Sequence, residues 1–375
     1  MTYTRRTFLA LAGAAAGLGL PLRARALSGS TPLVPREASL QLLPKGYPQT
    51  RIWGYDGAVP GTEIRVPQGA RVQRQLVNDL PEATSVHWHG IRIDNVMDGV
   101  SGLTQDAVPP GETFDYDFTV PDAGTYWYHA HNRSYVQVAR GLRGALIVAE
   151  PHAPDVDRDE VLILDDWLID PETGQIAKTF DQPMMMSHGG RSGNYVTTNG
   201  QYNLTLTAQR NDRLRLRLIN AANARIFALR LQGMTGWTVA LDGMPLAQPR
   251  PVADTLLLGP AQRIDLFVDI TAAQGELAAL LNVDTNEPFP QVAFTVTGQG
   301  AQVARAAPTA LPPNPRMDLP DLANATPVKL YMSGGAMGRM NAAVLNGERK
   351  GFRQLAEAGY FWALNGVANM PDTPL

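Results

Sequence analysis

The sequence predicts an all-β chain made of consecutive sandwich or barrel domains. The first observation is a series of short apolar runs, several of which alternate with polar residues as half-buried strands do. The second is frequent turn residues: the 375 residues include 35 Gly and 29 Pro, and Pro-Gly, Asp-Gly and Asn-Gly pairs separate the runs. The third is a weak internal repeat. Together these features are typical of turn-rich β proteins.

The expected strands follow one another along most of the chain. They are Glu63–Val66, Arg71–Val77, Ala145–Val148, Val161–Leu164, Arg213–Ile219 and Ile264–Val268. The strictest alternation is in Arg213–Ile219, where Arg and Leu alternate over six residues. A period of two places Arg213, Arg215 and Arg217 on one face of a strand. We expect that face to be exposed to solvent.

The internal repeat defines the expected domains. Tyr55-Asp56-Gly57 precedes a pair of runs that ends at Asn78, and Thr198-Asn199-Gly200 precedes a pair that ends at Asn220. Leu364-Asn365-Gly366 looks like the start of a third copy. The expected organisation is a signal peptide at 1–26, β domains at 31–150 and 155–300, a Pro/Ala-rich linker at 301–327, and the start of a third, incomplete domain at 328–375.

Composition excludes several classes of protein. Hydrophobic residues make up 44% and charged residues 18% of the chain, which favours a packed core over disorder. The net charge is −3 without a basic block, so nucleic acid is not an expected partner. Cysteine is absent. That excludes, for these residues, disulfides, iron–sulfur clusters, thiol nucleophiles and any blue-copper site with a thiolate ligand.

The N-terminus has the layout of a bacterial signal peptide. Arg5-Arg6 precedes an apolar stretch from Phe8 to Leu20, and Ala24-Arg25-Ala26 forms a small-x-small cleavage pattern. The paired arginines resemble a twin-arginine signal, which directs folded proteins, often with cofactor bound, to export. We therefore expect a periplasmic protein without a stable membrane anchor. The alternative is an uncleaved N-terminal anchor.

The histidines suggest metal chemistry. Four of the six lie in His87-Trp88-His89 and His129-Ala130-His131. In a strand, residues i and i+2 face the same side, so two such strands side by side would bring four imidazoles together. Neutral imidazole is a good ligand for copper, zinc, iron and nickel. The alternative is two exposed or core-packed pairs that bind no metal.

The surrounding motifs resemble those of a known family. Ser85–Ile91 and Gly124–His131 are similar to the first two copper-binding motifs of the multicopper oxidases, of laccase-like or copper-resistance type. Arg140–Ala145 and, further on, Leu258–Arg263 also look like family segments. Leu364–Gly366 resembles the family's entry into its third domain.

This resemblance implies cupredoxin-like domains, each a Greek-key β-sandwich, and copper as the cofactor. It implies that His87 binds the type 2 copper and that His89, His129 and His131 bind the type 3 pair. In the family these four supply half of the eight His of a trinuclear cluster between domains one and three. The cluster reduces O2 to water with four electrons, which a type 1 copper takes one at a time from a small reducing substrate.

The sequence departs from the family in its last part. No His follows His188 and no Cys is present, so the motifs that hold the type 1 copper and the other four cluster ligands are missing. We therefore expect a C-terminally truncated family member whose printed residues do not run the oxidase cycle by themselves.

Weaker signals accompany the main ones. Asp98 matches an acidic residue that in related oxidases assists proton delivery to oxygen; the alternative is a simple Asp-Gly turn. Met184-Met185-Met186 with His188 could bind Cu(I) through thioether sulfur, but a loop that packs against its neighbour is the favoured interpretation.

These signals leave competing functions. The first is an exported multicopper oxidase that acts on phenols, aromatic amines or cuprous ion. The second is a non-enzymatic periplasmic copper-binding protein in which the first domain keeps a four-His site. The third is a structural cupredoxin-like protein without metal, against which the retention of all four His argues.

Overall fold

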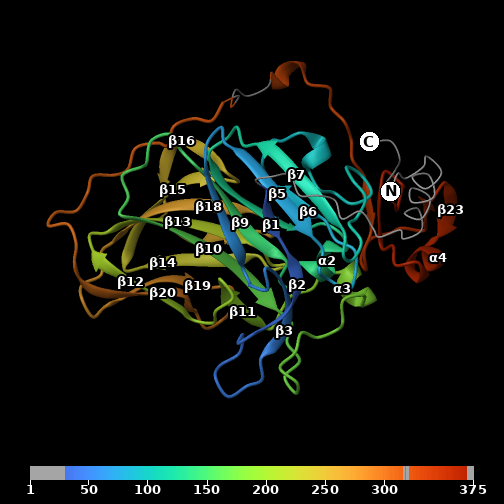
Figure 1. Ribbon diagram of the computed structural model, residues 1–375, viewed down its shortest axis with the longest axis horizontal. Helices are drawn as coiled ribbons and strands as arrows, with labels where there is room; N and C mark the ends of the chain where they lie inside the picture. Colours follow the sequence, from blue (N-terminus) through green and yellow to red (C-terminus); the bar gives the residue numbers. More distant parts are fainter. Residues whose placement is uncertain (1–29, 316, 318–320, 370–375) are drawn as a thin grey trace, which may run out of the picture.

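The computed structural model describes residues 30–315, 317 and 321–369, and the expected signal peptide lies outside them. Within these residues the chain forms two β-sandwiches in succession, followed by a smaller unit at the other side of the first sandwich (Figure 1). The all-β prediction is confirmed, since the helical segments are short.

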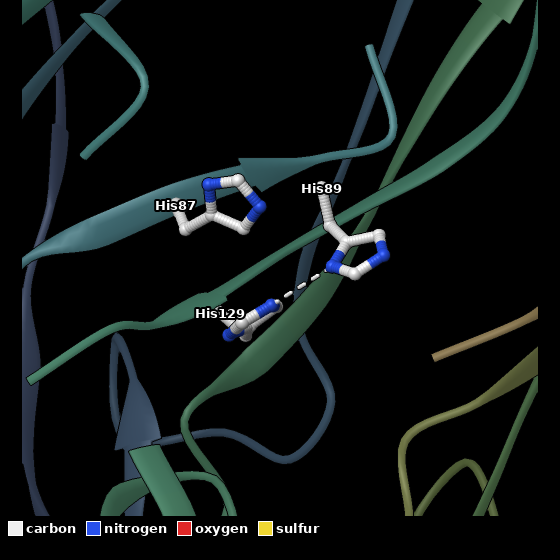
Figure 2. Close-up of side chains that lie close together, drawn as sticks. All are labelled: His87, His89 and His129. Carbon is white, nitrogen blue, oxygen red and sulfur yellow. Dashed lines mark hydrogen bonds between the residues drawn. The ribbon is translucent and has the colours of Figure 1, made fainter. Parts of the chain in front are cut away.

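The first sandwich carries both His-x-His pairs. One sheet contains β1 (Thr31–Leu33), β5 (Arg71–Val77) and β7 (Thr113–Thr119); the other contains, in order, β4 (Gly61–Pro67), β9 (Arg143–Ala149), β8 (Gly124–Ala130) and β6 (Val86–His89). Aromatic side chains such as Trp88, Tyr116 and Tyr128 fill the space between the sheets and are fully buried. Antiparallel pairing of β6 with β8 sets His87 directly opposite His129 (Figure 2).

The second sandwich is larger and has a more aliphatic core. One sheet contains β11 (Tyr195–Thr198), β10 (Arg158–Trp167), β13 (Arg213–Asn220), β18 (Arg263–Ile270), β15 (Met234–Leu241) and β16 (Met244–Pro251). The other contains β12 (Leu204–Arg210), β20 (Phe289–Gln299), β19 (Leu277–Asn282), β14 (Phe227–Gln232) and β17 (Leu256–Leu258). Leu, Val and Phe side chains from both sheets form one buried cluster between them.

The Asp-Gly and Asn-Gly pairs of the internal repeat all form the same turn. Asp56, Asn199 and Asn365 have φ angles of 56°, 51° and 48°, and the glycine after each also has a positive φ. Two successive positive φ angles define the type I′ turn, which Asn-Gly and Asp-Gly favour because few other residues tolerate that conformation. The turns follow β3 (Thr50–Tyr55), β11 and β24 (Trp362–Leu364), so equivalent strand ends recur along the chain.

The prediction that Arg213, Arg215 and Arg217 face solvent is wrong. Their exposed fractions are 2%, 0% and 1%. The alternation did identify residues on one face of a strand, but the first sandwich covers that face. Arg217 donates to Thr125 Oγ1 on β8 at 2.9 Å, and Arg215 pairs with Glu150, just after β9, at 2.8 Å.

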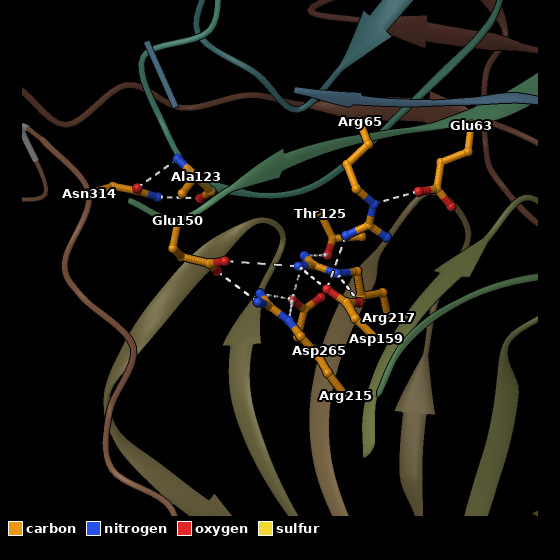
Figure 3. Close-up of polar contacts among 10 residues, drawn as sticks. All are labelled: Glu63, Arg65, Ala123, Thr125, Glu150, Asp159, Arg215, Arg217, Asp265 and Asn314. Carbon is orange, nitrogen blue, oxygen red and sulfur yellow. Dashed lines mark hydrogen bonds and ion pairs between the residues drawn. The ribbon is translucent and has the colours of Figure 1, made fainter. Parts of the chain in front are cut away.

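Buried ion pairs therefore join the two sandwiches (Figure 3). Within the second sandwich, Asp265 on β18 accepts hydrogen bonds from Arg215 at 2.6 Å and from Arg217 at 3.3 Å, which holds both arginines toward the first sandwich. Arg217 also pairs with Asp159 at 2.6 Å, and Asp159 in turn pairs with Arg65 on β4 at 3.1 Å. Burial raises the pKa of Asp159, but hydrogen bonds and charge from Arg217, Arg215 and Arg65 outweigh it, so the net pKa is lowered.

The segment after the second sandwich returns to the first. Around Asn314 it is irregular but anchored, because the Asn314 side chain donates to Ala123 O at 2.7 Å and accepts from Ala123 N at 2.8 Å (Figure 3). The last unit contains β21 (Met332–Gly334), β22 (Ala342–Leu345), β23 (Glu348–Gly351), α4 (Phe352–Glu357) and β24. A small cluster around the fully buried Leu355 forms its core.

Replacing Arg215 with Ala should strongly destabilise the protein. The substitution removes the 2.8 Å partner of the buried Glu150 and one of the two arginines that contact Asp265, and loss of one member of a buried ion pair typically costs about 3–5 kcal/mol. The matched control is Arg230→Ala, where an exposed arginine pairs with the exposed Asp254 and the expected loss is below about 1 kcal/mol. Urea unfolding followed by tryptophan fluorescence measures both. Equal losses in the two variants would contradict this account of the interface.

Candidate metal centre

The site is built on the paired strands β6 and β8. Their register sets His87 opposite His129 and His89 opposite Trp127, and His131 follows directly after β8. One ring nitrogen from each of His87, His89 and His129 lies within 4.8 Å of the other two (Figure 2). The His131 ring centroid is 5.2 Å from that of His87 and 6.0 Å from that of His129. All four imidazoles therefore lie in one group.

Backbone carbonyls orient two of the rings. His87 Nδ1 lies 2.7 Å from the carbonyl oxygen of Asp98, and His129 Nδ1 lies 2.9 Å from that of Ala130. A carbonyl oxygen only accepts, so in both rings Nδ1 carries the proton and Nε2 keeps its lone pair. This is the arrangement in which a histidine is held ready to ligate a metal through Nε2.

The electrostatic surroundings keep three of the rings neutral. Burial lowers the pKa of His89 to about 3, and the charge of Arg263 and the neighbouring His87 and His131 add to the effect. Burial likewise holds the pKa of His129 well below its usual range and lowers that of His131. At neutral pH these imidazoles carry no proton that a metal would have to displace.

Imidazole nitrogens in this arrangement fit copper. His89 Nδ1 and His129 Nε2 lie 3.2 Å apart, close to the spacing of two nitrogens that each lie about 2.0–2.1 Å from one ion in tetrahedral geometry. The pure nitrogen donor set suits copper, zinc and nickel, and copper binds most tightly of these in a given site. A pocket of about 330 Å³ gives solvent and small molecules access to the rings.

Asp98 lies beside the group. Its Oδ1 is 3.3 Å from His87 Nδ1 and its side chain is 30% exposed, so the carboxylate touches both the ligand ring and solvent. The Asp-Gly turn is present as well: Gly99 has a φ of 76°, and a Cβ there would lie 1.7 Å from the carbonyl oxygen of Val86. The two interpretations of Asp98 are thus compatible.

The second sandwich contributes residues that we did not predict for the site. Arg263 is 4% exposed, and a Cβ on Gly90 would lie 2.1 Å from its Nη2, so its guanidinium lies against the end of β6. Asn223 and Ala261 line the pocket opposite the histidines. The Leu258–Arg263 motif was the available sequence signal, but a motif does not tell which residues the arginine side chain contacts in the folded protein.

Aromatic residues near the ligands have separate roles. Trp88 and Tyr128 lie in the core of the first sandwich. Trp127 packs instead against the ligands, with its ring centroid 4.2 Å from that of His129 and 5.1 Å from that of His89. It therefore limits how far these two rings can turn.

The remaining histidine motif lies elsewhere. Met184–Met186 belong to α3 (Pro183–Ser187), and His188 Nδ1 lies 2.9 Å from the carbonyl oxygen of Met184, in the same short helix. The Met186 carbonyl accepts from Trp362 Nε1 at 2.8 Å, and the Ser187 carbonyl accepts from Ala336 N at 2.7 Å. The segment packs against the last unit of the chain, but as a short helix and not as the expected loop.

Comparison with known proteins places this chain and its fold in a family. Two models, both described as multicopper oxidase, match residues 38–153 and 158–298. The structure of a multicopper oxidase from Pseudomonas thermotolerans shares 35% identity with a TM-score of 0.74, covering 81% of this chain and 71% of that one. Lac15 from a marine microbial metagenome shares 40% identity with a TM-score of 0.69, covering 78% and 73%.

Curated relatives agree. Multicopper oxidase MmcO of Mycobacterium tuberculosis is 34% identical over 294 residues, which cover 70% of this chain and 56% of that protein. Copper resistance protein A of Pseudomonas syringae pv. tomato is 31% identical over 324 residues, covering 72% and 52%. The chain thus spans about half the length of the curated relatives it matches.

Tandem cupredoxin-like sandwiches with clustered imidazoles define a copper-protein architecture. The chain belongs to the multicopper oxidase family, whose members are oxidoreductases with copper cofactors.

The lowered histidine pKa predicts that the metal-free protein loses stability as the pH falls. Below about pH 6.5 the unfolded chain protonates His89, whereas the folded chain keeps it neutral down to about pH 3. The titration of His89 therefore has no effect on the free energy of unfolding above pH 6.5, and it lowers that free energy progressively between pH 6.5 and 3. At pH 5 the loss is about 2 kcal/mol for one such histidine.

The comparison that measures this is wild type against His89→Asn, with urea unfolding at pH 7.5 and pH 5. The wild type should lose about 2 kcal/mol more than the variant over this interval. His152→Asn, at an exposed histidine, is the control and should behave as wild type. If wild type and His89→Asn lose the same amount, the neutral buried state of His89 is wrong.

Proposed function

We propose that this chain forms the first two domains of an exported, laccase-like multicopper oxidase. The proposed reaction couples one-electron oxidation of a phenol, an aromatic amine or cuprous ion to four-electron reduction of O2 to water. The observation that carries the proposal is the convergence of four imidazoles where β6 pairs with β8, two of them oriented by backbone carbonyls and three of them held neutral. No such grouping is needed to stabilise a sandwich whose core lies elsewhere.

The proposed ligand roles follow the two strands. His87 would hold the type 2 copper, and His89, His129 and His131 would hold the type 3 pair. Bound copper would supply the one-electron chemistry by which O2 is reduced. The carbonyls of Asp98 and Ala130 fix the ring orientations, and Arg263 disfavours protonation of His89. The other cluster ligands and the thiolate of a type 1 site would come from residues outside these 375.

Asp98 is the proposed proton relay. Reduction of O2 to water consumes protons, and a carboxylate between solvent and a ligand histidine can pass them inward. Its 3.3 Å approach to His87 Nδ1 and its partial exposure support this role. The main-chain carbonyl of Asp98, not its carboxylate, makes the short contact that orients His87. The two tasks can therefore be separated by mutation.

A second candidate is a periplasmic copper-binding protein without oxidase activity. The observation that favours it is the absence of Cys and of any His after His188 in the sequence, which leaves four imidazoles and no thiolate. Sequencing the gene beyond the codon for Leu375 distinguishes the two. A continuation that contains a His-Cys-His motif supports the oxidase, and a stop codon supports the binding protein.

Export is also a proposal. The twin-arginine pattern at Arg5-Arg6 supports transport of the folded protein to the periplasm. Among the residues that the structure describes, no helix has the length and apolar character needed to cross a bilayer.

Copper titration of the 375-residue chain tests the ligand assignment. His87→Ala and His129→Ala should each weaken copper binding by at least about tenfold, because each removes an oriented donor from a shared site. Asp98→Asn should bind copper as wild type does, since the orienting carbonyl remains. His152→Ala at the exposed histidine is the matched control. Wild-type affinity in both ligand variants would exclude the assignment.

Oxygen uptake tests the activity itself. The 375 residues loaded with copper should not consume O2 with a phenol, because they lack the thiolate that the electron-accepting site requires. A longer polypeptide with the missing motifs should consume O2, and Asp98→Asn should slow it without loss of copper. Oxygen consumption by the 375-residue chain alone would contradict the proposed division of ligands.

A further inference from the structure

A second cleft, of about 480 Å³, opens on the first sandwich beside the hairpin of β2 (Pro35–Leu40) and β3. It shares no lining residue with the pocket of the four histidines. The chain passes from one to the other within two residues: Val138 lines the histidine pocket and Arg140 lines this cleft. Its volume falls within the range of small-molecule sites.

The hairpin register gives the cleft its first wall. Ser39 pairs with Arg51 and Glu37 pairs with Trp53, and side chains of directly paired residues lie on the same face of a sheet. Residues 51 and 53, two apart, also share a face. These four therefore line the cleft together. Trp53 Nε1 donates to Glu37 Oε1 at 3.1 Å, which holds the carboxylate at the wall.

Arg140 is fixed in the cleft by stacking. Its guanidinium carbon lies 4.6 Å from the Trp53 ring centroid and 5.1 Å from that of Phe180, so it lies between two aromatic rings. Its backbone carbonyl accepts from Trp53 N at 2.8 Å. Within the described residues its guanidinium makes no hydrogen bond or ion pair, and its Nε is buried. An arginine held rigidly without a partner is an unusual arrangement, since such groups normally find an acceptor.

Two more cations line the same cleft. Neither the Arg51 side chain nor Lys178 forms an ion pair or side-chain hydrogen bond in the part of the chain that the structure describes. Glu37 is the carboxylate among the lining residues, so the cleft carries an excess of positive charge. Burial lowers the pKa of Arg140, and the charges of the neighbouring Glu82 and Glu37 act in the opposite direction.

We propose that this cleft binds a small organic carboxylate. The planar guanidinium of Arg140 can donate two parallel hydrogen bonds to one carboxylate, and its aromatic neighbours fix its plane. Arg51 and Lys178 add charge at the rim, and the largely buried Ile52 and Ile176 also line the cleft. The site is independent of copper and of the proposed oxidase reaction. The proposal rests on this cleft alone.

Isothermal titration of the full 375-residue chain with 4-hydroxybenzoate tests the proposal. Saturable binding with a Kd below about 1 mM is expected, and 4-hydroxybenzamide, which has the same shape without the charge, should bind at least about tenfold more weakly. Inorganic phosphate, titrated separately, shows whether charge alone is sufficient; binding as tight as that of the benzoate would overturn the assignment to carboxylates.

Variants locate the site. Arg140→Gln should weaken benzoate binding at least about tenfold, and Lys178→Gln should weaken it by a smaller factor, about threefold. Circular dichroism shows whether Arg140→Gln is still folded. If it is not, Lys178→Gln alone tests whether the ligand binds in this cleft. Arg230→Gln, at an exposed arginine of the second sandwich, is the matched control. No saturation by wild type up to about 10 mM, or unchanged affinity in the folded cleft variants, overturns the proposal.

Discussion

The antiparallel register between β6 and β8 is the constraint on which the site depends. It sets His87 opposite His129, and the two-residue period then adds His89 and His131 on the same side. A shift of one residue would turn the imidazoles into the core and the indole of Trp88 outward. Packing prevents that shift, because Trp88 and Tyr128 are fully buried between the sheets. The hydrophobic core thus fixes the positions of the polar site.

The second sandwich fixes one side of the site. Across the interface Arg215 binds Glu150 and Arg217 donates to Thr125, while Asp265 on the neighbouring strand holds both arginines in place. Arg263 extends to the end of β6. Buried ion pairs are costly to desolvate, and well-packed apolar residues often give equal stability. Their benefit here is geometric: directional bonds fix one orientation of the second sandwich on the first. That orientation places Asn223 and Ala261 over the histidines.

The sequence predicted features that depend on local pattern, such as strands and turns. It missed contacts between segments that are distant in the chain. The all-β class follows from alternation and turn pairs, and the Asp-Gly and Asn-Gly turns at Asp56 and Asn199 have the conformation such pairs favour. Alternation placed the arginines of β13 on one face, but it could not say that Glu150 and Thr125, which are distant in sequence, lie against that face. The place of Arg263 beside Gly90 likewise exists only in the folded chain.

Copper X-ray absorption spectroscopy of the copper-loaded chain most directly tests the central claim, that these histidines form one copper site. The account predicts a first shell of nitrogen or oxygen at about 2.0 Å, with the outer-shell scattering of several imidazoles and no sulfur. That imidazole scattering should decrease in His129→Ala. A sulfur shell from the methionines near His188, or an imidazole signal unchanged in His129→Ala, would show that copper binds elsewhere.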